Sequence, residues 1–494
     1  MYATVNSTRA TPVPHTDNPP SPQCTETQDS NDILTQDIGR KLTFDNFDIH
    51  QKVHHMTEAH QNIDKHYVTM TSTKNRVCSF HLSDTPPEGD ILTFENGRCI
   101  PNHVEHNKQR ENYIVLVSRI ITSNINALKH LGDTVIKHIP HKYSKEMAQS
   151  TQTTFLGLLY HNENSSEGIL EILKELHKYV PFTGNGENRW YADLGVAGDQ
   201  LTVERAVNGH ASLGNGFTPE ERLDGLHFEI ADWHAGNKFL QVAFDHLYSA
   251  ASSRDKCTLY SDRNLINRRN VKTRVDSAVK PAHSLFDLCL KARIIAATLA
   301  VMGIGSVDDE CHDVPKAEDS KSSKADYLFK LASKVVDDYV LDGSGNELLA
   351  KSLVDDEQDM SSTDVRDTSS TDESASKFQD DMFSYQRALL EYGLLLYNFK
   401  DSVNEGDGTR IIRCWKFFLL HLKNSKSSTK YALKALYLMF QVYALLSPKA
   451  AHELIWNRSV KLRNNRGGNI PLDLQLEFYN RILKGGLVRK SFKI

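Results

Sequence analysis

The chain has 494 residues, of which 39% are hydrophobic and 24% charged, and its formal net charge is −5. This composition is that of ordinary globular protein and excludes a collagen-like or wholly disordered chain. The longest apolar runs, such as IIAATLAVMGIG at 294–305, are shorter than the roughly 18 apolar residues that a membrane span needs, so no membrane partner is expected.

The N-terminal residues and the cysteines indicate the compartment. Residues 1–39 are rich in Pro, Ser, Thr and Asn, which is typical of a disordered tail. They contain no charged segment followed by an apolar one, so secretion is not expected. The seven cysteines are widely spaced and form no CxxC motif, which predicts reduced thiols in an intracellular protein.

Four segments of the N-terminal half have the alternation or the β-branched and aromatic content of strands. These segments are 41–49, 66–72, 191–202 and 226–233. The turn residues Lys74 and Asn75 precede a further apolar segment, 76–82. This order predicts that 66–72 and 76–82 form a hairpin.

Helical spacing appears first between these strands and then through most of the C-terminal half. The predicted helices are 108–138, 165–180, 234–251, 283–302, 324–340, 378–399, 409–423, 428–446, 449–461 and one that begins near Pro471. Ser165 and Ser166 are suitable cap residues and Pro181 a suitable stop for the second helix. Two polar segments, 305–323 and 351–377, are too poor in apolar residues to form a core, which predicts acidic disordered loops.

Three acidic residues occupy informative places in this order of elements. Asp45 lies within the first strand, Asp199 ends a later strand, and Glu477 lies on the last helix. Gathered carboxylates can hold two Mg²⁺ or Mn²⁺ ions for phosphodiester chemistry, because these ions prefer hard oxygen ligands. The chain contains 63 acids, so an alternative remains open in which Asp45 and Asp48 cap turns and Glu477 faces solvent.

Several motifs resemble a large, multi-copy family of animals and fungi known as domain of unknown function 6589, whose members look transposon-borne. The motifs are FDNFDIHQKVHHMTEAHQNIDKHYVT, WYADLGVAGDQLTVERA, EERLDGLHFEIADWHAGNK, TLYSDRNLINRRNVK and GGNIPLDLQLEFYN. The resemblance covers roughly residues 40–485. It implies a transposase-like protein in which Asp45, Asp199 and Glu477 are the catalytic, metal-binding acids. The segment ADWHAGNK is similar to a short Asp-to-His motif of eukaryotic transposases, which makes Asp232 and His234 further catalytic candidates.

Basic residues suggest an anionic partner. Five of them lie close together in RNLINRRNVKTR: Arg263, Arg268, Arg269, Lys272 and Arg274. Residues 382–494 hold nineteen Lys and Arg against seven Asp and Glu, a net charge of +12. Contact with nucleic-acid phosphates is one interpretation, and a solvated surface is the other.

These observations predict an α/β protein whose RNase H-like core, a mixed sheet, contains a large α-helical insertion. The expected boundaries are a tail at 1–39, core strands and helices at 40–255, the insertion at 256–460 and a C-terminal core helix at 461–494. The expected function is that of a DDE-type DNA transposase, either active or a truncated or inactive copy, in the nucleus. A domesticated non-catalytic DNA- or chromatin-binding protein and an RNase H-like nuclease are the alternatives, and a homo-oligomer is a further expectation.

Overall fold

The computed structural model of this protein describes residues 39–341 and 381–491, apart from short gaps at 54, 59–60, 89–90, 186–188 and 426–427. The predicted tail before Gly39 and the predicted acidic loop at 351–377 lie outside the described residues. Within the described part, the chain is a mixed α/β protein built on one five-stranded sheet.

The strand order of the main sheet is β3-β2-β1-β6-β7. Its strands are β1 (Arg40–Gln51), β2 (Ile63–Lys74), β3 (Thr153–Leu159), β6 (Leu194–Gly198) and β7 (Leu226–Ile230). β2 runs antiparallel to β1 and β3, whereas β1, β6 and β7 are parallel to one another. Four of these strands confirm the sequence prediction, and β3 was not predicted.

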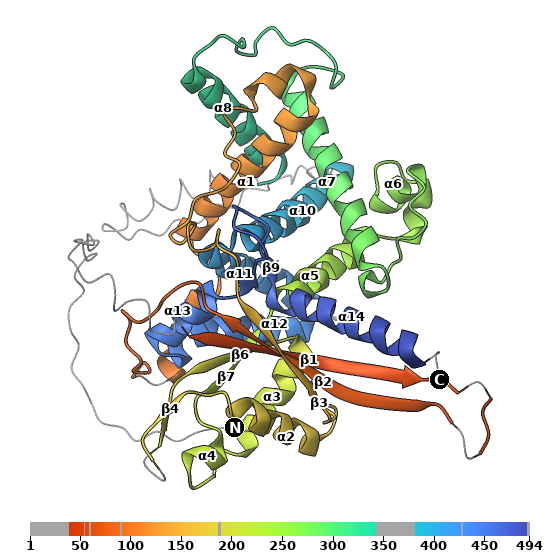
Figure 1. Ribbon diagram of the computed structural model, residues 1–494. Helices are drawn as coiled ribbons and strands as arrows, with labels where there is room; N and C mark the ends of the chain where they lie inside the picture. Colours follow the sequence, from red (N-terminus) through yellow and green to blue (C-terminus); the bar gives the residue numbers. More distant parts are fainter. Residues whose placement is uncertain are drawn as a thin grey trace, which may run out of the picture. The chain divides into compact units, whose positions relative to one another are not determined.

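One face of the sheet packs on two helices, α2 (Ser166–His177) and α3 (Gln200–Ser212). Leu42 and Phe44 point from β1 into this core, because alternate side chains of a strand lie on opposite faces. Thr43, Asp45 and Phe47 therefore point to the other face. Figure 1 shows α2 and α3 below the sheet and α14 (Leu472–Ser491) above it.

The second face is covered by α14 and by the helical part of the chain. α5 (Asp232–Leu247) follows β7 and leads from the sheet into this helical part. Its buried side chains share a large apolar core with those of the later helices. The remaining helices are α1 (His103–Asn124), α4 (Pro219–Arg222), α6 (Leu259–Leu265), α7 (Val279–Met302), α8 (Lys321–Tyr339), α10 (Asp381–Glu405), α11 (Gly408–Asn424), α12 (Thr429–Phe440) and α13 (Pro448–Trp456).

Two small antiparallel pairs complete the strands, β4 (Phe182–Thr183) with β5 (Trp190–Tyr191) and β8 (Ser459–Val460) with β9 (Ile470–Pro471). Residues 303–320, which overlap the predicted loop 305–323, form turns and bends between α7 and α8. A backbone hydrogen bond of 2.9 Å from the Asn126 N–H to the Val307 carbonyl ties this loop to the end of α1. Among the described helices, none has the length and apolar character needed to cross a bilayer.

The predicted hairpin of 66–72 with 76–82 is wrong. β2 is already paired on both sides, with β1 and with β3, so it has no free edge for residues 76–82. The Asn457 side chain instead accepts hydrogen bonds from the backbone N–H groups of Arg76 and Val77, at 3.0 and 3.1 Å. The side chain of Asn457, which follows α13, therefore takes the place of the strand-to-strand hydrogen bonds of the predicted hairpin.

Candidate active site

Asp45 and Asp199 come together because their strands are parallel neighbours. Leu42 pairs with Val196 and Thr43 with Ala197, so continuing the register by two residues brings Asp45 beside Asp199. Asp45 is 5% exposed in the middle of β1 and accepts a 2.9 Å hydrogen bond from the Asn46 N–H. Asp199 caps α3, and its Oδ1 accepts a 2.7 Å hydrogen bond from the Thr202 N–H.

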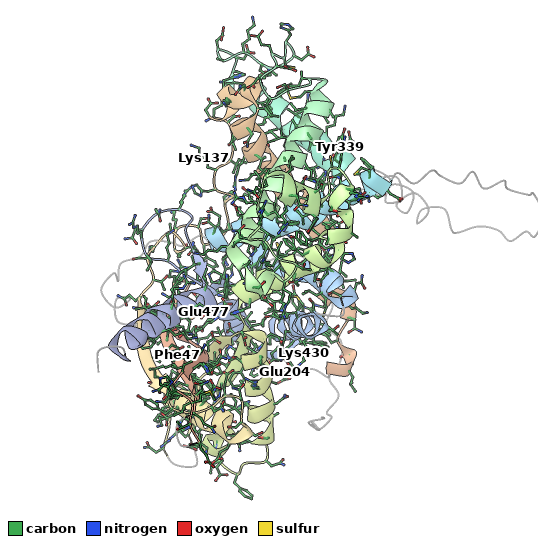
Figure 2. All side chains as sticks on the ribbon, turned by 90° about the vertical axis from the view of Figure 1, so that its right-hand side faces the viewer. Phe47, Lys137, Glu204, Tyr339, Lys430 and Glu477 are labelled. Carbon is green, nitrogen blue, oxygen red and sulfur yellow. The ribbon has the colours of Figure 1, made fainter. Side chains whose placement is uncertain are left out.

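Glu477 reaches the same face of the sheet from α14. One turn further along this helix, Asn480 is buried and accepts a 2.7 Å hydrogen bond from the Thr69 hydroxyl. Thr69 lies directly opposite Asp45 in the β1–β2 ladder. This hydrogen bond fixes α14 over the strand that carries Asp45, and Figure 2 shows Glu477 above Phe47 of β1. The Glu477 side chain remains partly exposed.

The pKa of Asp45 is influenced by the other acids of this region. Burial raises the pKa of Asp45 well above its usual value, and the negative charges of Asp199, Glu477 and Glu163 raise it further. The charge of His234 acts in the opposite direction. A buried carboxylate among other carboxylates has an elevated pKa because ionisation adds a like charge in a poorly solvated place.

Glu163 is a fourth acid that the sequence analysis missed. It lies just before α2, is 4% exposed and accepts a 2.8 Å hydrogen bond from Arg205 of α3. Thr202 also hydrogen-bonds to it, at 3.3 Å. Burial, and then the charge of Asp199, raise the pKa of Glu163. Its position in a loop between predicted elements gave no periodic signal that could have identified it.

His234 pairs with Asp473 of α14. The ring Nδ1 lies 3.0 Å from Asp473 Oδ2, and the same carboxylate accepts hydrogen bonds from the backbone N–H groups of Trp233 and His234. Burial lowers the pKa of His234, but the hydrogen bond and charge of Asp473, with the charges of Asp199 and Asp45, outweigh it. The resulting pKa is about 9. His234 is therefore a cation facing the acids at neutral pH.

The expected catalytic role of Asp232 does not agree with its contacts. The Asp232 carboxylate is 2% exposed, and Arg458 binds both of its oxygens at 2.8 Å. The Trp415 indole N–H donates a further 2.8 Å hydrogen bond to Oδ1. A carboxylate that is saturated in this way holds the helical part of the chain against the end of β7. We therefore assign Asp232 a structural role.

Asp473 and Glu477 occupy the same side of α14, because residues four apart on a helix lie one above the other. Asp473 caps the first turn of α5 and orients His234, while Glu477 faces Asp45. The spacing of four residues between Asp473 and Glu477 in PLDLQLE is the signal that identifies Asp473, which is not among the predicted site residues.

Two other acids that could have replaced members of the cluster lie elsewhere. Asp48 is exposed on β1 and pairs with His66 at 2.7 Å, and its odd spacing from Asp45 places it on the opposite face. Asp193 precedes β6, at the opposite end of that strand from Asp199, and accepts a 3.1 Å hydrogen bond from Ser447.

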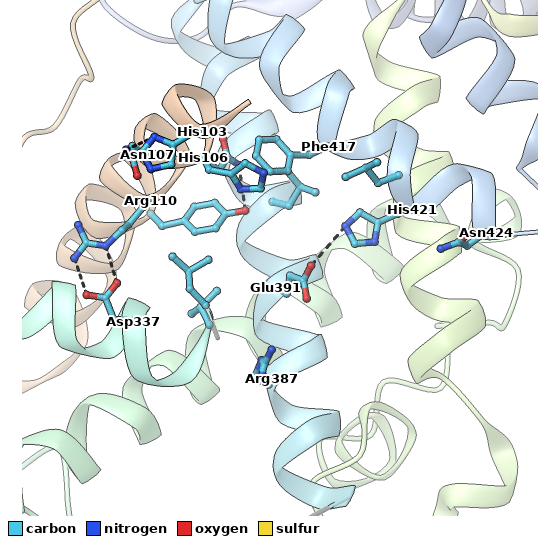
Figure 3. A pocket seen from close by; sticks show the side chains of 16 residues that line it. His103, His106, Asn107, Arg110, Asp337, Arg387, Glu391, Phe417, His421 and Asn424 are labelled. Atoms are coloured by element: carbon cyan, nitrogen blue, oxygen red, sulfur yellow. Dashed lines mark hydrogen bonds and ion pairs between the residues drawn. The ribbon is translucent and has the colours of Figure 1, made fainter. Parts of the chain in front are cut away.

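A cavity of about 670 Å³ between α1, α8, α10 and α11 is separate from the acids. Figure 3 shows two contacts between side chains of opposite kind in its wall, Arg110 with Asp337 and His421 with Glu391. Arg110 binds Asp337 at 2.6 Å, and His421 lies 3.7 Å from Glu391. The lining of this cavity contains none of Asp45, Asp199, Glu477 and Glu163, so we do not place the chemistry there.

The five predicted phosphate-binding residues lie on α6 and the segment after it. Arg263 donates hydrogen bonds to the carbonyl oxygens of Val271 and Arg269, and so stabilises this segment itself. Arg268, Arg269, Lys272 and Arg274 are exposed. The segment contacts α5 at Gln241 and Tyr248, two turns or more beyond His234. It is therefore a separate basic surface.

The chemical character of the acidic cluster suits a hard divalent cation. Asp45, Asp199, Glu477 and Glu163 offer carboxylate oxygens, and their repulsion would be relieved by a cation. As the side chains stand, no three His, Cys, Asp or Glu groups of the described residues are gathered closely enough to hold a metal ion. Completing such a site requires side chains to rotate. The Glu477 side chain is partly exposed, so it has room to do so.

The profile of a family of unknown function, DUF6589, matches residues 93–491. The chain belongs to this family. The matched range contains Asp199, His234, Asp473 and Glu477, whereas Asp45 precedes it. No curated protein and no solved structure matches the chain. Membership therefore gives no activity, and the function rests on the site.

Proposed function

We propose that this protein is a metal-dependent enzyme of phosphodiester chemistry on DNA, of the DDE transposase type. The observation that carries the proposal is the convergence of Asp45, Asp199 and Glu477 from two adjacent parallel strands and one helix. Asp199 follows the carboxyl end of β6, and the carboxyl ends of parallel strands are a common location for ligands in α/β proteins. Carboxylate clusters of this kind serve two-metal displacement reactions.

The sheet topology supports the same proposal. In the order β3-β2-β1-β6-β7, only β2 runs against the other four strands. An RNase H-like fold is expected to have this arrangement, with the first strand at the centre of the sheet, so the strand order supports the proposal. The helices between α5 and α14 would then be the large insertion.

Bound Mg²⁺ or Mn²⁺ would activate a water molecule or a 3′-hydroxyl of the DNA as the nucleophile and would stabilise the leaving oxygen. Asp45, Asp199 and Glu477 would hold the ions, and Glu163 would add negative charge at their edge. His234, kept protonated by Asp473, offers a ring N–H at Nε2 to a non-bridging phosphate oxygen. Such a donor stabilises charge that develops on the phosphate.

The test is cleavage of supercoiled and linear DNA by the full chain with Mg²⁺ or Mn²⁺. We expect Asp199→Asn, Asp45→Asn and Glu477→Gln each to abolish cleavage without weakening DNA binding. Asp48→Asn is the matched control, because Asp48 lies on the same strand but on the opposite face. Equal cleavage by Asp199→Asn and the wild-type chain would refute the proposed site.

A second candidate is a non-catalytic DNA- or chromatin-binding protein with the same fold. The observation that favours this candidate is that no three of the described acids stand at metal-binding spacing. Salt-dependent DNA binding without metal-dependent cleavage would select this candidate, and cleavage without strand joining would instead select a nuclease. All of these activities on DNA imply a nuclear location.

A further inference from the structure

Four aromatic side chains lie on the same face of the sheet as the acids, and we name them the aromatic ridge: Tyr67, Phe155, Tyr160 and Tyr479. Tyr67 of β2 lies opposite Phe47 in the ladder, two residues along from Thr69, which lies opposite Asp45. Two residues of a strand span about 7 Å. The ridge therefore begins next to the acidic cluster.

The ridge is open to solvent along the outer side of the sheet. Tyr160 follows β3, is 76% exposed, and its ring packs edge-on against Tyr67 with centroids 5.2 Å apart. Phe155 of β3 is 37% exposed, and the centroid of its ring lies 5.7 Å from that of Tyr479 of α14. β3 is an edge strand, and in Figure 1 it lies beside β2 below α14. Large exposed rings that cluster on a surface usually mark a binding site.

Positive charge accompanies the ridge on α14. Arg481 and Lys484 follow Glu477 by four and seven residues, so they lie on the same side of the helix. Both are exposed, and the Lys484 Nζ lies 5.4 Å from the centre of the Phe47 ring. The surface next to the acids thus combines flat rings with cations. This combination is what a single nucleic-acid strand requires, because its bases stack and its phosphates are anionic.

We propose that the aromatic ridge binds unpaired nucleotides of single-stranded DNA that flank the phosphate held at the acidic cluster. This inference rests on the proposed function, because it assigns the state of the substrate at that site. Base faces are hidden within a duplex, so exposed rings can stack on bases only where the strand is unpaired or its bases are extruded. Arg481 and Lys484 would neutralise the phosphates between these bases.

The test measures binding of a fluorescein-labelled oligothymidine to the full chain by anisotropy, in EDTA so that no cleavage occurs. Stacking on one aromatic side chain predicts that Tyr160→Ala weakens single-strand binding by about 5- to 100-fold. Tyr160→Phe should keep the wild-type affinity, because stacking needs the ring and not the hydroxyl. Tyr179→Ala is the matched control, since Tyr179 is 45% exposed just beyond α2, on the opposite face of the sheet.

Binding of the corresponding duplex should be much less affected by Tyr160→Ala. Unchanged single-strand affinity in both Tyr160→Ala and Tyr67→Ala would overturn the inference, and so would equal losses for single strand and duplex. If Tyr160→Ala instead dissociates an oligomer in sedimentation without changing DNA affinity, the ridge is a self-association surface and the inference is wrong. Cleavage that depends on Asp199 but not on Tyr160 would leave the proposed function standing, whereas a wild-type chain that neither binds nor cleaves DNA would remove both.

Discussion

Replacing Asp473 with Asn tests how the protein keeps His234 charged. Asp473 accepts a 3.0 Å hydrogen bond from His234, and its charge is among the largest influences that raise the pKa of this imidazole to about 9. In Asp473→Asn the charge is lost while an amide oxygen remains to accept the backbone N–H bonds of α5. We expect the pKa of His234 to fall to its ordinary value or below, because burial then dominates.

The size of the effect follows from the shift in pKa. A rise from 6.5 to about 9 corresponds to about 3 kcal/mol of folding free energy at 1.36 kcal/mol per unit. The folded-state pKa is raised, so this stabilisation is fully present below pH 6.5 and is lost as the pH rises through about 9. The His234 side chain is only 25% exposed, so solvent screens the pair incompletely.

Urea unfolding at pH 6 and pH 10 measures the difference. We compare the difference in free energy of unfolding between the wild-type chain and Asp473→Asn at the two pH values. This difference should be about 3 kcal/mol larger at pH 6 than at pH 10. His234→Gln, which removes the titrating ring and leaves Asp473 in place, should lack the same pH-dependent part. A gap between wild type and Asp473→Asn that is equal at both pH values would refute this reasoning.

Three further changes have predictable outcomes. Arg458→Met leaves the Asp232 carboxylate buried without its guanidinium and should cost about 3–5 kcal/mol in urea unfolding; a loss below about 1 kcal/mol would contradict the structural role of the pair. Asp45→Asn should raise the melting temperature of the metal-free protein at pH 8 but not at pH 4. The pKa of Asp45 is raised in the folded protein, so this carboxyl destabilises the fold at any pH at which it ionises in the unfolded chain. An equal shift in melting temperature at both pH values would show that charge is not the cause. The double change Arg268→Ala and Arg269→Ala should lower the slope of log K against log salt for duplex binding by about one to two, and an unchanged slope would remove these residues from the DNA surface.

Much of the sheet could be predicted because its strands carry local signals. The alternation in 41–49 and 226–233 and the apolar run that ends at Asp199 correspond to β1, β7 and β6. β3 could not be recognised, because FLGLL is a short apolar run interrupted by Gly157, whose φ of 111° accompanies a register shift against β2. Such a run is compatible with strand, helix or loop until its partner is known.

The site was only partly predictable because its pairings are long-range. The places of Asp45, Asp199 and Glu477 on their elements predict a shared site. The structure sets Asp45 beside Asp199 and α14 over the strand of Asp45, but no three of the described acids stand at metal-binding spacing. The partner of His234 could not be predicted, because Asp473 is 239 residues away in the sequence. The residues next to Asp232 in the sequence do not show that its carboxylate binds Arg458 and not a substrate. That contact joins residues that are far apart in the sequence.

The proposed function depends most directly on whether the clustered acids bind a divalent cation. Isothermal titration calorimetry of Mn²⁺ into the wild-type chain, Asp45→Asn and Asp48→Asn measures this without requiring DNA. We expect the wild type and Asp48→Asn to bind Mn²⁺ with the same affinity and stoichiometry, and Asp45→Asn to lose that binding, since it removes the central buried carboxylate. Indistinguishable Mn²⁺ binding by the wild type and Asp45→Asn, or none by the wild type, would contradict the proposed metal site.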